Sequence, residues 1–346
     1  MMKKFLLFAA LVCMCSTVSA QKTSQDYAYV IGFLQKILTA DQGGEYQQVI
    51  NLTKEFLTHS AERQYADTLK QEMYALLAKN HFYLHQYDPA IECGKKVLQI
   101  ENQIHGDDTY IYLYTLRNLV LYYYNGGYYE KTIATGLDLM GRLEKSHQDN
   151  DREYAYQIRL VSKSYESLRD YNNALLYGEK TLRKVETLPD GDDSDKMKLL
   201  EDLGFYCYSL KKFTSAIKYT LEAADIQKGL KGVNNDKYMD DLDFISLYYS
   251  FLGDYANAIK YRAETLKIKA RVYGTNDIEY AKTLIMLANY YSMLGNYNQA
   301  IKYETDAAII IKNKSGIHNV GYIITIWDLC KYYKAKGYYV EAYQLS

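Results

Sequence analysis

Apolar residues recur at helical spacing along the chain, and the clearest stretch runs from residue 277 to residue 312. Its first half, DIEYAKTLIMLANYYSMLG, forms one apolar helix face with Leu284, Leu287, Ala288, Tyr291 and Leu294. Its second half, NYNQAIKYETDAAIIIK, forms another with Tyr297, Ala300, Ile301, Ala307 and Ala308. Gly295 interrupts the pattern between them. The stretch therefore predicts two amphipathic helices joined by a tight turn.

The same hairpin recurs along the chain with a period of 42 residues. The aromatic residue that opens its second helix is found at Tyr87, Tyr129, Tyr171, Phe213, Tyr255, Tyr297 and Tyr339. Residues 60–346 are predicted to be seven tandem units, of which the last is incomplete. Residues 21–59 are predicted to be a degenerate first unit, with helices over 27–38 and 46–57 and with Gly43 and Gly44 between them. The whole chain would then hold eight helix pairs.

The loops between units follow the same period. Glycines that end one helix are expected at Gly106, Gly232, Gly274 and Gly316. Capping residues for the next helix follow them, at Asp107-Asp108, Asn234-Asn235-Asp236, Asn276-Asp277 and Asn319. Small side chains that allow close helix packing are Ala90, Thr132, Ala174, Ala216, Ala258 and Ala300. Unit five has Lys211 where the hairpin turn would take a glycine.

A period of 42 residues alone fits HEAT and armadillo repeats as well as an extended tetratricopeptide repeat. The internal spacing decides between them. Residues 284–301 read L-x-x-L-A-x-x-Y-x-x-x-G-x-Y-x-x-A-I, which resembles a tetratricopeptide hairpin, and the extra residues follow the second helix as in kinesin light chains. The resemblance implies an all-α fold, a right-handed superhelical solenoid of antiparallel helix pairs that binds other proteins.

The first twenty residues resemble a bacterial export signal, with Lys3 and Lys4, an apolar run, and Val18-Ser19-Ala20 before the expected cleavage site. We expect a periplasmic or secreted protein with no membrane span after cleavage. The chain has 41 Lys and Arg residues against 42 Asp and Glu, and losing the two signal lysines leaves a net charge near −3. Nucleic acid is therefore not an expected partner. The remaining cysteines, Cys93, Cys207 and Cys330, are expected to be buried thiols.

No arrangement of residues predicts catalysis or a cofactor. His81 and His85 stand one helical turn apart, as metal ligands do, but His81 occupies a core position of the repeat and no third ligand has a fixed spacing to them. The Ser, Cys and His residues lie on the repeat pattern or in loops without a nucleophile motif. The chain is expected to be neither an enzyme nor a metalloprotein.

The remaining polar and aromatic positions lie on the first helix of each unit, and in this family that face lines a concave groove. We expect the groove of units three to five to bind a protein or peptide through Tyr114, Arg117, Leu121, Tyr124, Tyr156, Arg159, Lys163, Phe205 and Tyr208. Units five and six add acids at Glu201, Asp240 and Asp243. A purely solvated face is the competing interpretation. The carboxylate clamp of chaperone-binding tetratricopeptide domains is absent from the pattern.

Two further expectations concern the end of the chain. Tyr339, Ala342 and Tyr343 begin a second helix that is shorter than its siblings, and its uncovered apolar face predicts fraying or self-association. Arrays of this kind also resemble those that precede CHAT-type peptidases or sensor kinases. The alternative function is therefore the sensory region of a larger effector. Trp327 falls on the groove side of the pattern, although a Trp there is more often a core residue.

Overall fold

A computed structural model describes residues 24–63, 67–146, 152–188 and 193–345, and over these residues the chain forms sixteen helices and no strand. The predicted signal, residues 1–20, lies outside the described residues. The helices gather into two compact units, residues 1–170 and residues 171–346, called the N-terminal and C-terminal units below. Each unit is described by itself.

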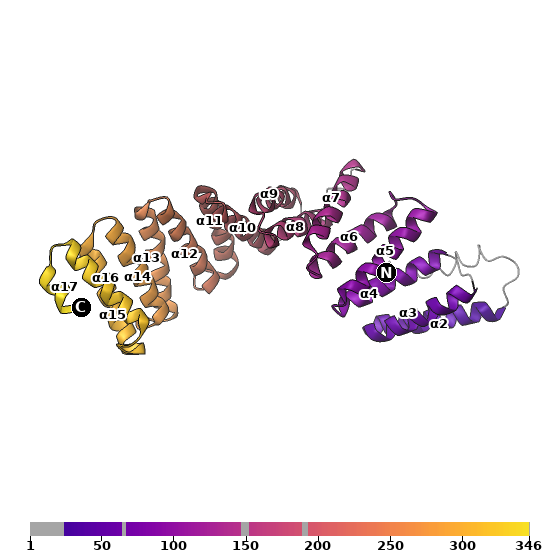
Figure 1. Cartoon of the computed structure of the whole chain (residues 1–346), viewed down its shortest axis with the longest axis horizontal. Coiled ribbons are helices and arrows are strands. Elements are labelled where there is room, and N and C mark those ends of the chain that lie inside the picture. Colours follow the sequence, from indigo (N-terminus) through magenta and orange to yellow (C-terminus); the bar gives the residue numbers. More distant parts are fainter. Residues whose placement is uncertain (1–23, 64–66, 147–151, 189–192, 346) are drawn as a thin grey trace. The chain divides into compact units, whose positions relative to one another are not determined.

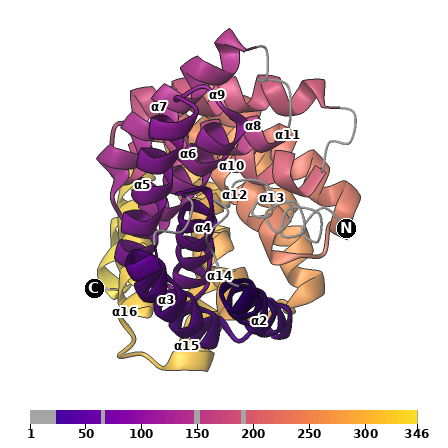
Figure 2. The ribbon, with the colours of Figure 1, turned by 90° about the vertical axis from the view of Figure 1, so that its right-hand side faces the viewer.

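In the N-terminal unit consecutive helices pack against each other in chain order (Figures 1 and 2). Helix α6 also contacts α8. The helices are α2 (Ser24–Gly43), α3 (Tyr46–Arg63), α4 (Asp67–Tyr83), α5 (Tyr87–Ile104), α6 (Tyr110–Asn125), α7 (Tyr129–Lys145) and α8 (Arg152–Ser167).

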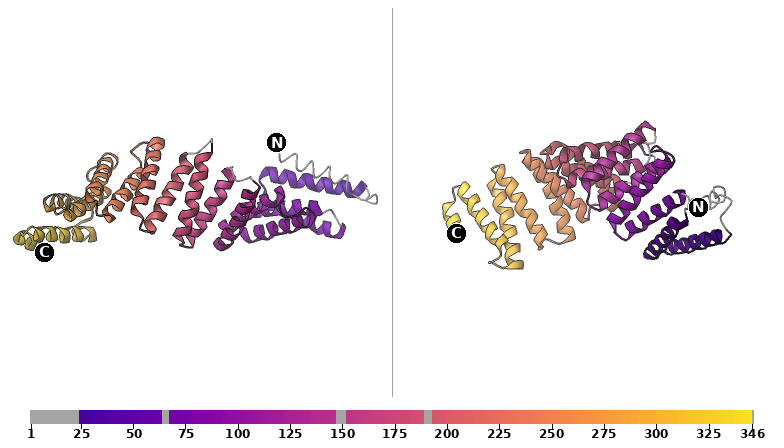
Figure 3. Two further views of the ribbon diagram at one scale, coloured as in Figure 1. Left: turned by 90° about the horizontal axis from the view of Figure 1, so that it is seen from above. Right: turned by 45° about the vertical axis from the view of Figure 1, so that its right-hand side comes forward.

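The C-terminal unit continues the pattern from α9 to α17, and Figures 1 and 3 show its last helices side by side in chain order. Its helices are α9 (Tyr171–Thr187), α10 (Asp193–Ser209), α11 (Phe213–Lys231), α12 (Asp236–Phe251), α13 (Tyr255–Val272), α14 (Ile278–Met293), α15 (Tyr297–Ser315), α16 (Val320–Ala335) and α17 (Tyr339–Leu345). Along the described helices, none combines the length and the hydrophobicity that crossing a bilayer requires.

The predicted period is confirmed at its anchor positions. Each of the seven aromatic residues is the first residue of its helix, from Tyr87 in α5 to Tyr339 in α17. The small residues three positions later, from Ala90 to Ala300, are fully buried. Small side chains there let the two helices of a pair approach closely, which is the packing that the sequence predicted.

Most predicted caps are confirmed, and one is wrong. The side chains of Asn235, Asp277 and Asn319 accept backbone N–H bonds at the starts of α12, α14 and α16. Helix α6 is capped by Thr109, whose hydroxyl accepts from the N–H of Tyr112 at 3.1 Å, and not by Asp107 or Asp108. Those two acids instead bind Arg142 of α7.

The predicted core is confirmed in part. Leu284, Leu287 and Ala288 are buried, whereas Leu294 is 51% exposed because it lies past the end of α14, where the helix face no longer points inward. Cys207 and Cys330 are buried free thiols, but Cys93 is only half-buried, a correction to the expectation for that residue. His81 is buried, as its repeat position predicted.

Candidate ligand-binding surfaces

The N-terminal unit presents seven of the predicted groove residues on two contacting helices. This α6–α8 face consists of Tyr114, Arg117, Leu121 and Tyr124 on α6 with Tyr156, Arg159 and Lys163 on α8. The four α6 residues recur every three or four positions, so they follow one side of the helix, and the three α8 residues do the same. These seven predicted residues therefore lie along two contacting helices of the N-terminal unit.

Aromatic rings dominate the exposed part of the α6–α8 face. Tyr114 is 53% exposed and stacks on Tyr110, with ring centroids 6.1 Å apart and planes at 18°. Tyr156 is 42% exposed. Its phenol has a raised pKa because of partial burial first and then because of Glu153 and Tyr124, which places Tyr124 of α6 close to Tyr156 of α8. Rings on both helices thus lie within reach of one ligand.

Charged groups lie among these rings. Arg159 counteracts the raised pKa of Tyr156, so its guanidinium is near the phenol. Arg117 and Leu121 are half-buried on the same side of α6. Lys163 is tied to Glu166 one turn away on α8 by a short ion pair. Because the carboxylate of Glu166 offsets the charge of its ammonium, Lys163 supplies less positive charge to the face than the sequence suggested.

The two predicted residues of the C-terminal unit have different surroundings. Phe205 of α10 is 42% exposed and meets the edge of Tyr171, with centroids 5.8 Å apart. Tyr208 is half-buried against Tyr248 and Phe251, at 5.4 Å and 6.0 Å between centroids. Tyr208 therefore belongs mainly to an aromatic cluster that packs α10 against α12.

The sequence prediction missed two exposed rings of that cluster. Phe244 and Phe251 of α12 are both about half exposed, and Phe244 contacts Tyr248 while Phe251 stacks on Phe213 at 4.9 Å. They stand eleven and four residues before Tyr255, and Phe244 directly follows the predicted Asp243. Their run of aromatic residues at helical spacing, F-I-S-L-Y-Y-S-F, was the signal that could have found them.

The acidic groups predicted for units five and six are largely paired inside the protein. Asp243 binds Arg262 of α13 at 2.5 Å between Oδ1 and Nη1, and it also binds Lys269 at 3.2 Å between Oδ2 and Nζ. Glu201 binds Lys237 at 3.1 Å. Of the three predicted acids, Asp240 alone is exposed, as expected. An acidic groove in this region is thus weaker than predicted.

Two buried carboxyl groups of the C-terminal unit were not singled out by the sequence. Asp241 of α12 is buried near Glu201, and burial followed by that neighbouring charge raises its pKa to about 7. Glu304 of α15 is fully buried, and burial followed by the nearby Asp328 raises its pKa to about 8. Neither oxygen of Glu304 has a hydrogen-bond partner among the residues that the structure describes. Such groups are costly unless they stay protonated or meet a cation.

The exposed side of α16 carries the single tryptophan of the chain. Trp327 is 63% exposed, so the core position that is common for a Trp at this point of the repeat does not apply. The ammonium of Lys331 lies 3.4 Å from the centroid of its ring and 2.9 Å from Asp328 Oδ1. Tyr339 and Tyr343 of the short helix α17 are also exposed, while Ala342 is buried.

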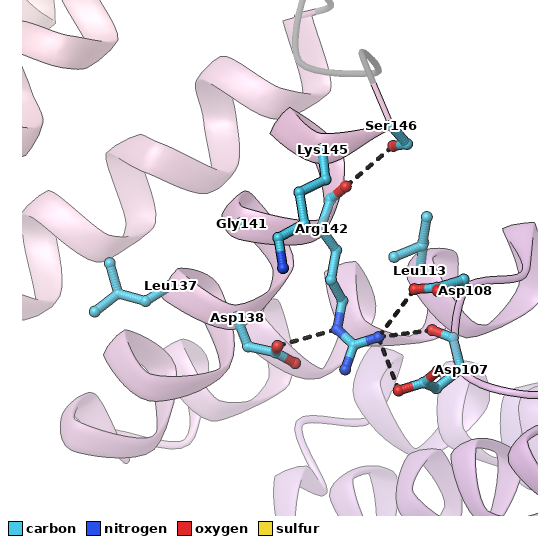
Figure 4. Close-up of a pocket in the computed structure, with 9 residues that line it drawn as sticks. All are labelled: Asp107, Asp108, Leu113, Leu137, Asp138, Gly141, Arg142, Lys145 and Ser146. Atoms are coloured by element: carbon cyan, nitrogen blue, oxygen red, sulfur yellow. Dashed lines mark hydrogen bonds and ion pairs between the residues drawn. The ribbon is translucent and has the colours of Figure 1, made fainter.

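A cavity of about 590 Å³ lies away from the predicted face, between the loop after α5 and helix α7 (Figure 4). Figure 4 shows the Arg142 side chain running toward three acids of its lining. Arg142 binds Asp107 at 3.0 Å, Asp108 at 3.3 Å and Asp138 at 3.0 Å. These three carboxylates neutralise the charge of Arg142. The arginine is therefore better explained as a structural link between α7 and the loop after α5 than as part of a ligand site.

The two histidines considered as metal ligands have other partners. His81 Nδ1 is 2.6 Å from Gln86 Oε1, and burial lowers the pKa of its ring. His85 sits in the turn after α4, with Nδ1 2.9 Å from the Tyr87 hydroxyl. Within the described ranges, no three or more His, Cys, Asp and Glu side chains are grouped as metal ligands would be.

Comparison with known proteins identifies the repeat. Residues 242–308, from α12 to α15, match the family model of the tetratricopeptide repeat. They include most of the stretch from which the period was derived. A search of curated proteins found no match.

Solved structures agree on the fold. RapI in its apo form is 15% identical, with 92% of this chain and 96% of RapI covered and a TM-score of 0.51. A Signal Transduction ATPase with Numerous Domains with a tetratricopeptide repeat sensor, from Pyrococcus horikoshii, is 19% identical, with 84% of this chain and 43% of that chain covered and a TM-score of 0.50. A structure of nearly identical TPR-like repeats of a putative kinesin light chain from Podospora anserina is 13% identical over 59% of this chain and 96% of its own, and its TM-score of 0.47 is too low to add to the argument. At these identities the similarity concerns the fold alone.

Proposed function

Because the chain carries tetratricopeptide repeats, we propose that it is a protein-interaction scaffold that binds a peptide or an extended protein segment on the first helices of its repeats. The observation that carries this proposal is the α6–α8 face, where the exposed rings of Tyr114 and Tyr156 share two contacting helices with Arg117 and Arg159, and where Arg159 lies near the Tyr156 phenol. Exposed rings beside Arg are the residue types that contribute most to binding energy at protein interfaces.

The chemistry of the face favours a ligand that carries both carboxylates and apolar side chains. Arg117 and Arg159 are equivalent residues of successive units, so a ligand that crosses α6 and α8 would meet one guanidinium on each helix. Charge would steer the ligand to the face, and contact with the tyrosine rings would hold it there. The C-terminal unit has a more apolar surface of its own, which consists of the exposed rings of Phe205, Phe244 and Phe251.

The binding experiment starts from a random peptide library selected on the immobilised protein. We expect the selected peptides to be rich in Asp or Glu beside aromatic or aliphatic residues. The double variant Arg117→Glu, Arg159→Glu should then bind them at least about tenfold more weakly, since two attractive charges become repulsive.

A matched control separates this face from a general charge effect. The double variant Lys54→Glu, Lys96→Glu makes the same change in net charge on exposed positions of the second helices α3 and α5. It should bind the selected peptides as the unmodified protein does. Equal weakening by both variants, or none by either, would contradict a ligand site on the α6–α8 face, provided that circular dichroism confirms folding.

The site of action is a separate proposal, since the signal-like segment lies outside the described residues. We infer from Lys3, Lys4 and the apolar run before Ala20 that the protein acts in the periplasm or outside the cell. The mass of the intact protein from its own host tests this inference. The expected chain begins at Gln21, and a mass that still includes residues 1–20 would refute export by cleavage.

A further inference from the structure

One position of the repeat differs in kind from unit to unit. It lies seven residues after the aromatic residue that opens each second helix and is called the seam position here. It is occupied by Gly94, Gly136, Gly178, Thr220, Arg262 and Glu304 in units two to seven. The residues around it show that it faces the first helices. A Cβ atom at Gly136 would lie 2.5 Å from Val161 of α8, and Arg262 reaches Asp243 of α12.

The polar residues that occupy the seam position before Glu304 have partners within the C-terminal unit. Thr220 hydrogen bonds with Tyr248 of α12, and it lies directly against Gly204 of α10. Arg262 is bound by the carboxylate of Asp243, and its Nη2 donates to the Asp243 carbonyl at 3.2 Å. The seam position of unit six therefore holds a buried guanidinium–carboxylate pair, which is the arrangement that a buried charge requires.

Glu304 lacks such a partner. The residue that corresponds to Asp243 in its unit is Ile285, an apolar side chain that cannot pair with a carboxylate. Glu304 is fully buried, and both of its oxygens are without hydrogen-bond partners within the described part of the chain. A buried carboxyl with neither oxygen bonded is rare and calls for an explanation, of which a missing ligand is one.

The surroundings of Glu304 suit a cation. The groups of α16 that face it are Asp328, Lys331 and Tyr332, as their mutual electrostatic effects show. The Lys331 ammonium already lies between Asp328 and the ring of Trp327. These two side chains therefore bind a cationic group, which here is the chain's own lysine. The Tyr332 hydroxyl donates to Asn289 Oδ1 of α14 at 2.8 Å and links α14 to α16 beside the site.

We propose that the surface over Glu304, where Tyr332 of α16 is linked to Asn289 of α14 and Lys331 rests on Trp327, is a site for the cationic side chain of a lysine or arginine in a bound peptide. The proposal rests on the proposed function, and it adds a second specificity element some distance along the chain from the α6–α8 face. The incoming ammonium or guanidinium displaces Lys331 from Trp327 and Asp328 and pairs with the Glu304 carboxylate.

Binding of the cation is coupled to a proton. Glu304 holds its proton in the free protein near neutral pH, and the proton leaves to the solvent when the cation arrives, so one positive charge replaces another. The titratable or charged groups that face Glu304 are Asp328, Lys331 and Tyr332 from α16, while α14 offers the neutral Asn289. At pH values below the pKa of about 8, the affinity for the cation should therefore increase about tenfold for each unit by which the pH rises.

Trp327 makes the test specific, because it is the only tryptophan of the chain and lies at the rim of the site. Two short peptides are compared, identical except that one carries lysine where the other carries norleucine. The lysine peptide should change the Trp327 fluorescence in a saturable way, with weaker binding at lower pH, and the norleucine peptide should not. Calorimetry in two buffers of different ionisation enthalpy should detect proton release.

The variant Glu304→Gln keeps the shape of the side chain and removes the charge. It should weaken binding of the lysine peptide at least about tenfold and abolish both the pH dependence and the proton release. Equal binding by Glu304→Gln, or no saturable change with the unmodified protein, would overturn the proposal. Its failure is distinguishable from that of the proposed function, because peptides selected on the library depend on Arg117 and Arg159 in the other unit.

Discussion

The two units of the protein fill the seam position of their repeats differently. In the N-terminal unit Gly94 and Gly136 lie directly beneath aliphatic side chains, and a Cβ atom would lie 2.9 Å from Leu119 or 2.5 Å from Val161. In the C-terminal unit only Gly178 of α9 keeps a glycine, and Thr220, Arg262 and Glu304 occupy the position in the helices that follow. One fold thus accommodates close backbone packing or a polar contact at the same slot. The polar solution creates charged groups that need partners, and these give the C-terminal unit a chemistry that the N-terminal unit lacks.

The largest expected effect comes from breaking the pair in unit six. Asp243→Asn removes the carboxylate that both Arg262 and Lys269 bind. We expect the free energy of unfolding to fall by about 3 kcal/mol, since removing the anion of a buried ion pair leaves uncompensated charge. Urea denaturation measures the change. Adding Arg262→Met should restore much of the loss, and a double variant no more stable than Asp243→Asn would show that the pair is not what stabilises the slot.

The glycine solution is tested in the N-terminal unit. Gly136→Val places a branched side chain against Val161, and overpacking of this kind should lower the free energy of unfolding by about 2 kcal/mol. Gly141→Ala on the same helix is the matched control, because nothing lies within 4 Å of its Cβ position. That change should stabilise the protein by about 1 kcal/mol through helix propensity. Destabilisation by both variants alike would mean that close packing at Gly136 is not the cause.

Glu304 is expected to make the stability of the protein depend on pH. Its pKa is about 8 in the folded protein against 4.5 for an ordinary glutamate, so the folded state keeps a proton that the unfolded state has lost between these values. Stability from this group is complete below pH 4.5 and declines as the pH rises toward 8. Glu304→Gln should therefore stabilise the protein by about 3 kcal/mol at pH 7 and by almost nothing at pH 4. Thermal denaturation across this range measures it, and a constant difference would contradict the assignment.

The smallest expected effect concerns the hairpin turns, where the two units do not differ in kind. Lys211 adopts a left-handed backbone with φ of 57°, and Gly253 and Gly295 hold the equivalent position in the next units at 74° and 72°. Lys211→Gly should stabilise the protein by about 1 kcal/mol, because a side chain is strained in this conformation. Gly253→Ala is the reverse change and should destabilise it similarly. No difference between the two would show that these turns carry little strain.

The sequence predicted the architecture well because packing fixes it locally. The aromatic anchors and small residues recur at one period, and each anchor begins a helix as expected. A hairpin is specified by its own residues, so few distant contacts are needed to place it. The cap of α6 was predicted wrongly because Asp107, Asp108 and Thr109 are all good capping residues, and only the position of Arg142 shows why the two acids are used elsewhere.

The site was less predictable than the fold. Periodicity placed Tyr114 and Tyr156 on an exposed face, but it could not show that Asp243 is taken up by Arg262 on another helix. Phe244 was missed because it lies one position after the predicted Asp243, and helix faces are broader than one position. Glu304 was missed because its lack of a partner is a property of the packed structure. Which charged side chains are paired therefore could not be predicted without knowing which helices contact each other.

Photocrosslinking tests the central claim most directly, since it reports which side chains touch the ligand. A benzoylphenylalanine residue is placed at Tyr114, at Tyr156 or, as a control on the second helix α7, at the exposed Leu137. With a peptide selected from the library, we expect crosslinks from the first two positions and none from Leu137. Crosslinks from Leu137 alone, or from all three positions equally, would contradict binding on the α6–α8 face.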